Sequence, residues 1–142
     1  MNVWNKSRVW MVRTLPSTTW LRGGGVTASV EGALTWHDDH IEFTPVAHAD
    51  EATAIPLSSV RRIRRPPGGP VIELQVATRG DKHVVWFYFV KPVDGVRRWE
   101  GRGVRNATMA VSVGRLGVAN AIWGDEVSSW YERIRSWSQV DT

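Results

Sequence analysis

Two histidines flank an Asp-Asp pair in the segment ALTWHDDHIEFTP, and imidazole nitrogens are common ligands of transition metals. A two-residue turn at Asp38 and Asp39 would place His37 opposite His40 on neighbouring strands, with Cβ atoms about 5 Å apart. Such a pair can share one ion, but two histidines without a fixed third ligand make a weak site. We therefore interpret them as an exposed hairpin tip and expect no metal and no other cofactor.

Two arginine-rich segments could bind an anion. The first contains Arg61, Arg62, Arg64 and Arg65, of which at most two can share one face of a strand. The second is the Gly-containing segment RRWEGRGVR, in which arginines could bind phosphates while the tryptophan stacks on a base or lies at a lipid headgroup. Its candidate binding residues are Arg97, Arg98, Trp99, Arg102 and Arg105. The alternative is a solvated loop whose tryptophan packs against the protein.

The sequence argues against most catalytic classes. It contains no cysteine, which excludes thiolate nucleophiles and cysteine-ligated metals. Ser58 and Ser59 lack the Gly-x-Ser-x-Gly context of a nucleophile elbow. His48 and His83 have no evident carboxylate or nucleophile partner, and the acidic residues cluster in loops and hairpin tips. We therefore predict that the chain is not an enzyme.

The length of 142 residues fits one domain over residues 1–142. The net charge is +4, but residues 31–54 carry six acids and no Lys or Arg, whereas residues 55–105 carry a net charge of +7. An anionic partner would suit that basic half, and a solvated basic face is the alternative. No signal-peptide core and no transmembrane span are evident, so we expect a cytoplasmic protein.

The hydrophobic pattern of the first ninety residues is that of β-strands. Period-two alternation around the Asp-Asp turn pairs Trp36 with Ile41 on a buried face and leaves His37, His40 and Glu42 on the other face. Residues 71–78 alternate again, with Glu73 expected outside, and residues 83–90 are apolar on both faces, as in a central strand. Residues 8–15 could be a strand or a helical turn. The segment IPLSSVRRIRR begins as a strand and ends at the prolines and glycines of residues 66–70.

The last third of the chain changes to a helical period. We predict a final helix from Asp125, as N-cap, to Trp137, with Trp130, Ile134 and Trp137 packed on the sheet. Before it, small residues recur at helical spacing and would allow another backbone to approach closely, which predicts self-association or a tight helix contact. These residues are Ala110, Gly114, Gly117 and Ala121. An alternating strand over residues 109–113 is the alternative for part of this stretch.

Strands that lead into a closing helix with buried tryptophans resemble the pleckstrin-homology superfold, and GRAM-like domains most of all. The segment GALTWHDDHIEFTP resembles the hairpin "G-x-Leu-x-x-Thr-x-x-x-Leu-x-Phe" of those domains, and IPLSSVRRI resembles their "Ile-Pro-Leu-x-x-Ile" strand. The resemblance implies a mainly β fold, a partly open barrel of about seven antiparallel strands capped by an amphipathic helix. Residues 93–124 look like an insertion before that helix.

The function we expect is a non-catalytic binding or assembly module that contacts a protein partner or itself, with a homo-oligomer expected. The alternative is an anion-binding module for phospholipid headgroups or nucleic acid, acting through the arginine and tryptophan segments. The alternative requires salt-sensitive binding, because phosphate contacts release counterions.

Overall fold

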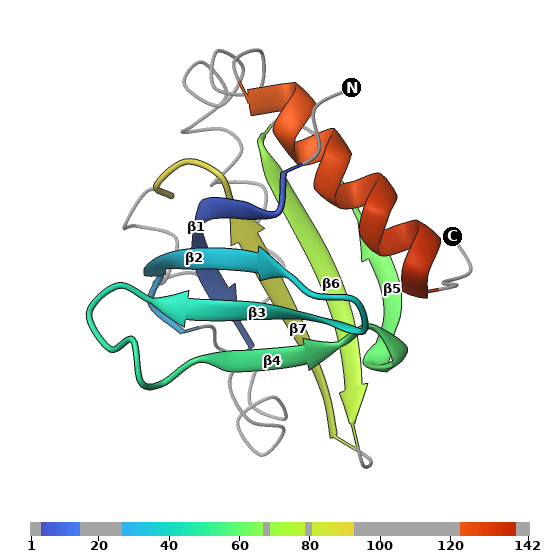
Figure 1. The fold of residues 1–142 in the computed structure, drawn as a ribbon, viewed down its shortest axis with the longest axis horizontal. Helices are drawn as coiled ribbons and strands as arrows, with labels where there is room; N and C mark the ends of the chain where they lie inside the picture. Colours follow the sequence, from blue (N-terminus) through green and yellow to red (C-terminus); the bar gives the residue numbers. More distant parts are fainter. Residues whose placement is uncertain (1–3, 15–26, 67–68, 79–80, 93–122, 139–142) are drawn as a thin grey trace.

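The computed structural model describes residues 4–14, 27–66, 69–78, 81–92 and 123–138, and it has seven antiparallel strands and a C-terminal helix (Figure 1). The strands are β1 (Lys6–Arg13), β2 (Val30–Trp36), β3 (His40–Pro45), β4 (Thr53–Pro56), β5 (Val60–Arg64), β6 (Val71–Thr78) and β7 (Asp81–Tyr88). They form one sheet in the order β4-β3-β2-β1-β7-β6-β5. The predicted mainly β fold is confirmed, and the sheet is open, with β4 and β5 at its edges.

The sheet curls over one hydrophobic core. Figure 1 shows β2, β3 and β4 running across the direction of β6 and β7. Phe43 of β3 and Phe87 of β7 are separated by two strands in the sheet order, yet their ring centroids lie 6.1 Å apart. Both rings are fully buried, as are Leu34, Ile72 and Leu74. The inner faces of the two halves therefore bury their side chains against each other.

The β2–β3 hairpin has the predicted register. Trp36 pairs with Ile41, Thr35 with Glu42 and Leu34 with Phe43, as the alternation required. The backbone N–H of His37 donates a 2.9 Å hydrogen bond to the carbonyl oxygen of His40, which closes the turn at the two aspartates. Period-two alternation thus buries one face of the hairpin and leaves the histidine face partly exposed.

The segment IPLSSVRRIRR forms two strands that lie at opposite edges of the sheet, whereas the sequence indicated only that it begins as a strand. Strand β4 ends at Pro56, a short 3-10 helix spans Leu57–Ser59, and β5 begins at Val60. The side chain of Leu57 is buried, which anchors this turn in the core. For residues 8–15 the sequence left a strand or a helical turn open. The described part of this segment is a strand, because β1 pairs with both β2 and β7.

The C-terminal helix covers residues 123–138 and lies across the sheet near β5 and β6 (Figure 1). Val127, Trp130 and Ile134 are fully buried, so the predicted apolar stripe is its packing face. Trp137 is 58% exposed, although its ring contacts Trp36 edge-on with centroids 6.3 Å apart. The prediction that Asp125 caps the helix is wrong, because the two residues before it are already helical.

Polar contacts fix the helix to the first two strands. The indole N–H of Trp130 donates to Ser7 Oγ at 2.8 Å, and Arg133 Nη1 donates to Asn5 Oδ1 at 2.9 Å. The guanidinium carbon of Arg133 also lies 4.2 Å from the ring centroid of Trp36, a cation–π distance. None of the described helical residues forms a segment with the length and apolarity that a bilayer crossing needs.

Candidate functional site

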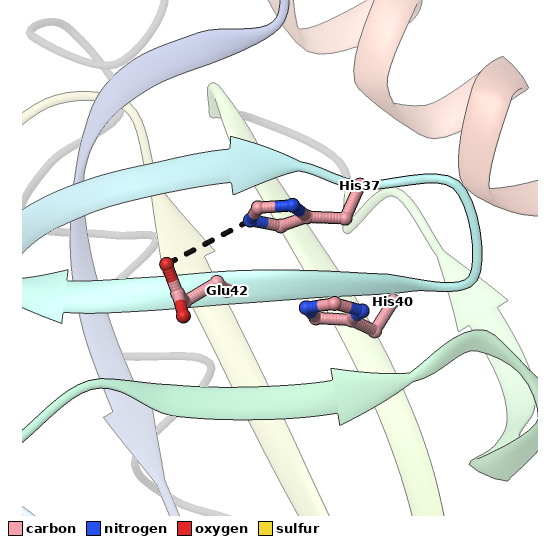
Figure 2. A group of neighbouring side chains, drawn as sticks. All are labelled: His37, His40 and Glu42. Atoms are coloured by element: carbon pink, nitrogen blue, oxygen red, sulfur yellow. Dashed lines mark ion pairs between the residues drawn. The ribbon is translucent and has the colours of Figure 1, made fainter.

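The outer face of the β2–β3 hairpin brings His37, His40 and Glu42 together (Figure 2). The turn sets His37 and His40 side by side, and β3 then carries Glu42 onto the same face two residues later. One ligand atom from each of the three side chains lies within 4.8 Å of the other two. All three side chains are partly exposed, although the Nε2 atom of His37 itself is shielded from solvent.

The two imidazoles stack almost in parallel, with ring centroids 4.4 Å apart and planes 7° apart. Figure 2 shows the Glu42 carboxylate on the side of both rings that points away from the turn. Glu42 Oε1 lies 3.7 Å from His37 Nε2, which is too long for a hydrogen bond. His37 Nε2 is shielded from solvent and has no hydrogen-bond partner among the described residues. A polar atom is thus left unsatisfied close to two other potential ligand atoms.

Asp39 orients the second imidazole. Its Oδ1 lies 2.6 Å from His40 Nδ1, and this hydrogen bond, more than any other contact, holds the pKa of the Asp39 carboxyl below its ordinary value. The charges of His40 and His37 act in the same direction, whereas desolvation opposes them. A carboxylate at Nδ1 favours the tautomer with its proton on that nitrogen, which leaves the Nε2 lone pair available for a ligand or an ion.

Sequence reasoning identified the two histidines and placed Glu42 on their face, but it did not count Glu42 as a third ligand. The signal was present in the hairpin register, because Glu42 pairs with Thr35, two residues before His37. Alternation predicts the face of the strand on which a side chain lies, but it does not predict how close the Glu42 carboxylate comes to the imidazoles. The cross-strand geometry supplies that missing information.

The arginines of β5 have different surroundings. Arg61 and Arg62 are both exposed, although alternation predicts opposite faces for neighbours, because the register with β6 shifts between Val60 and Arg62. Arg65 Nη1 donates to Ser128 Oγ of the helix at 2.8 Å. Arg64 is partly buried and forms an ion pair with Glu73, N to O 3.4 Å. Arg65 is exposed as well but is bonded to the helix, so Arg61 and Arg62 are the more available cations of this segment.

Glu73 is buried, contrary to its predicted exposure. It pairs across the sheet with Arg64 on one side and Trp86 on the other, and these neighbours enclose its carboxylate. Trp86 Nε1 donates to Glu73 Oε1 at 2.9 Å, and Arg64 Nη1 approaches Oε2. A buried carboxylate that accepts such bonds is a structural element of the sheet.

The remaining predicted site residues lie outside the described part of the chain. They are the arginine–tryptophan segment, Arg97, Arg98, Trp99, Arg102 and Arg105, and the small-residue stripe, Ala110, Gly114, Gly117 and Ala121. Both belong to the predicted insertion, of which only residues 123 and 124 are described. These assignments stay predictions.

Comparison with known proteins leaves the site to be interpreted from its own geometry: no protein-family model matches this sequence, and no curated protein matches it significantly.

Proposed function

We propose that this chain is a non-catalytic binding module that takes an extended acidic segment of a protein along the edge of β5 that no other described strand pairs with. One observation carries the proposal: β5 is an edge strand, and its two consecutive arginines, Arg61 and Arg62, are exposed. Among the described residues, β6 is the single strand that pairs with β5. An acidic segment laid beside it would find both backbone groups and cations.

The chemistry of such an edge favours a peptide with alternating side chains. An extended segment adds a strand through main-chain hydrogen bonds, and side-chain contacts supply specificity. Arginine suits carboxylates because its planar guanidinium can donate two parallel hydrogen bonds. Charged side chains on an edge strand also discourage indiscriminate pairing, so an acidic partner is selected over an apolar strand.

The number and direction of the strands support a related proposal about the fold family. The resemblance implies about seven antiparallel strands closed by a helix, and the described residues form seven antiparallel strands and a C-terminal helix. We therefore keep the GRAM-like, pleckstrin-homology-like assignment as our proposal. Fold-level likeness implies no ligand, so the function rests on the β5 edge.

A second copy of the chain is one candidate for the acidic partner. Residues 31–54 carry six acids, of which Glu31 forms an ion pair with Arg8. Asp38, Asp50 and Glu51 are exposed, and the last two lie in the turn that leads into the edge strand β4. Charge complementarity between the acidic turn that precedes β4 and the basic β5 edge supports self-association as the form that this binding takes.

The proposal is tested with the double variant Arg61→Glu/Arg62→Glu, with Lys6→Glu/Lys91→Glu as the control. The control changes the net charge equally at two other exposed cations. Each protein is titrated with a short alternating Glu-Val peptide, with phosphatidylserine vesicles and with oligothymidylate, at low and moderate salt. Light scattering reports the oligomeric state of each protein.

Loss of peptide binding or of an oligomer in the β5 variant, with both retained in the control, supports the proposal. Salt-sensitive binding to vesicles or oligothymidylate that depends on the same arginines, without peptide binding, favours the anion-binding alternative. A parent protein that binds none of the probes and stays monomeric contradicts both functions for this edge.

A further inference from the structure

The β2–β3 hairpin carries a second candidate site that is independent of β5. Its three side chains, His37, His40 and Glu42, offer two imidazole nitrogens and a carboxylate oxygen within 4.8 Å of one another. Nε2 of His37 is shielded from solvent but makes no hydrogen bond to the described residues. A shielded polar atom without a partner is destabilising, and a cation bound at that nitrogen would satisfy it.

One of the three ligand distances is already close to that of a zinc site, whereas the two imidazole rings must turn to hold an ion. Zinc binds imidazole nitrogen at about 2.0–2.1 Å and carboxylate oxygen at about 2.0–2.2 Å, so tetrahedral ligand atoms lie roughly 3.3 Å apart. His37 Nε2 and Glu42 Oε1 are already 3.7 Å apart. The lone pairs of stacked, parallel rings do not converge, so a rotation about the Cβ–Cγ bonds is needed. The partial exposure of all three side chains leaves room for it.

The surroundings of His40 already match those of a metal ligand. Metal-bound imidazoles usually donate their other ring N–H to a carboxylate, which fixes the tautomer and increases ligand basicity. Asp39 occupies that position, 2.6 Å from His40 Nδ1. His40 therefore presents Nε2 as its free ligand atom, on the side where Figure 2 shows Glu42.

We propose that His37, His40 and Glu42 bind one Zn²⁺ ion on the outer face of the hairpin. Two imidazoles and one carboxylate suit a borderline metal better than Mg²⁺ or Ca²⁺, which prefer oxygen, or Cu(I), which prefers sulfur. Three protein ligands leave the fourth tetrahedral position for water or for a donor from a partner. The bound ion would join β2 to β3 at the turn and place a positive charge beside Asp39.

The experiment titrates the intact protein with Zn²⁺ by isothermal calorimetry and by competition with a chromogenic chelator. The test variants are His37→Ala, His40→Ala and Glu42→Gln, and His48→Ala is the control because it removes an exposed histidine outside the cluster. Far-UV circular dichroism without metal establishes that each variant folds. X-ray absorption of the zinc complex reports the number of imidazole ligands.

The expected result is one Zn²⁺ per chain, bound through two imidazoles, with affinity reduced at least about tenfold in each test variant and unchanged in the control. The proposal is overturned if the folded His37→Ala and His40→Ala variants bind zinc as tightly as the parent. It is equally overturned if His48→Ala abolishes binding, or if the parent binds no zinc. The Glu42→Gln variant separates a three-ligand site from a histidine pair, since unchanged affinity there removes the carboxylate from the site.

Discussion

The indole N–H of Trp130 donates a hydrogen bond of 2.8 Å to the hydroxyl of Ser7, and both residues are buried. This contact joins the C-terminal helix to the first strand across 123 positions of sequence. A tryptophan that fills the core and also satisfies its one polar group is held in a single orientation. This side chain therefore contributes both core packing and a directional hydrogen bond to the position of the helix on the sheet.

Replacing Trp130 by alanine should destabilise the fold by about 3–5 kcal/mol, because it leaves a large cavity in the core. Ser7→Ala should cost about 1–3 kcal/mol, because the indole N–H then stays buried without an acceptor. Urea unfolding followed by circular dichroism measures both. Trp137→Ala is the control on the same helix, and it should cost clearly less because Trp137 is largely exposed. Equal losses at positions 130 and 137 would contradict this packing.

Gly32 on β2 lies where the structure has no room for a side chain. A Cβ there would lie 2.5 Å from the carbonyl oxygen of Thr44 and 2.6 Å from Cζ of Phe43. The backbone oxygen belongs to a paired strand and cannot move freely, so Gly32→Ala should cost about 1–3 kcal/mol through overpacking. Denaturant melts of the purified variant measure the loss.

Gly124 provides the matched control for that substitution. A Cβ at this helical position meets no atom within 4 Å. Gly124→Ala should therefore be neutral or stabilising, by up to about 1 kcal/mol, since alanine has the higher helix propensity. A harmless Gly32→Ala would contradict the close approach of β2 and β3, and a destabilising Gly124→Ala would contradict the open surroundings of that helical position.

The register of the β2–β3 hairpin could be predicted because one alternation and one turn determine every pair. Leu34, Trp36, Ile41 and Phe43 must share the buried face, and a turn at the two aspartates satisfies all four at once. A shift of the strand register by one residue would expose all four apolar side chains, so only one register fits the pattern. The same alternation placed the histidines and Glu42 on one face.

The side-chain contacts could not be predicted in the same way. Alternation placed Glu73 outside the core, but an alternating pattern carries no information about how Arg64 and Trp86 enclose the Glu73 carboxylate. It also could not indicate that a register shift exposes both Arg61 and Arg62. The apolar stripe of the helix continues to Trp137, although full burial stops at Ile134. The periodicity of the sequence determines which face of a strand or helix a side chain lies on. Whether that side chain is buried depends on which other elements are close to it in space.

The stability of the fold should depend more on the hydrogen-bond acceptor oxygens of the buried Glu73 carboxylate than on its negative charge. Glu73→Ala removes the acceptor of the Trp86 indole and the partner of Arg64, and should cost about 1–3 kcal/mol. Glu73→Gln retains an oxygen for the indole and should cost less. Chemical denaturation of both variants measures the difference. If glutamine destabilises as much as alanine, the ion pair with Arg64 is the larger contribution.

The Asp39–His40 hydrogen bond should increase zinc affinity beyond the effect of charge alone. Asp38 and Asp39 are adjacent, exposed aspartates of one turn, but only Asp39 is hydrogen-bonded to an imidazole among the described contacts. That bond lowers the pKa of Asp39, so its carboxylate stays charged to lower pH than that of an ordinary aspartate. Removing such a partner of a metal ligand typically lowers affinity about ten- to hundredfold.

Asp39→Ala should therefore weaken Zn²⁺ binding about ten- to hundredfold, and Asp38→Ala should weaken it less, although each variant loses one negative charge near the ion. Chelator competition at one pH and one ionic strength compares the two variants, so long-range screening is the same for both. Melting temperatures without metal should stay near that of the parent, because both side chains are exposed. Equal affinity losses would mean that the carboxylates act on the ion through charge only, and that the orientation of the His40 ring by Asp39 contributes nothing to the site.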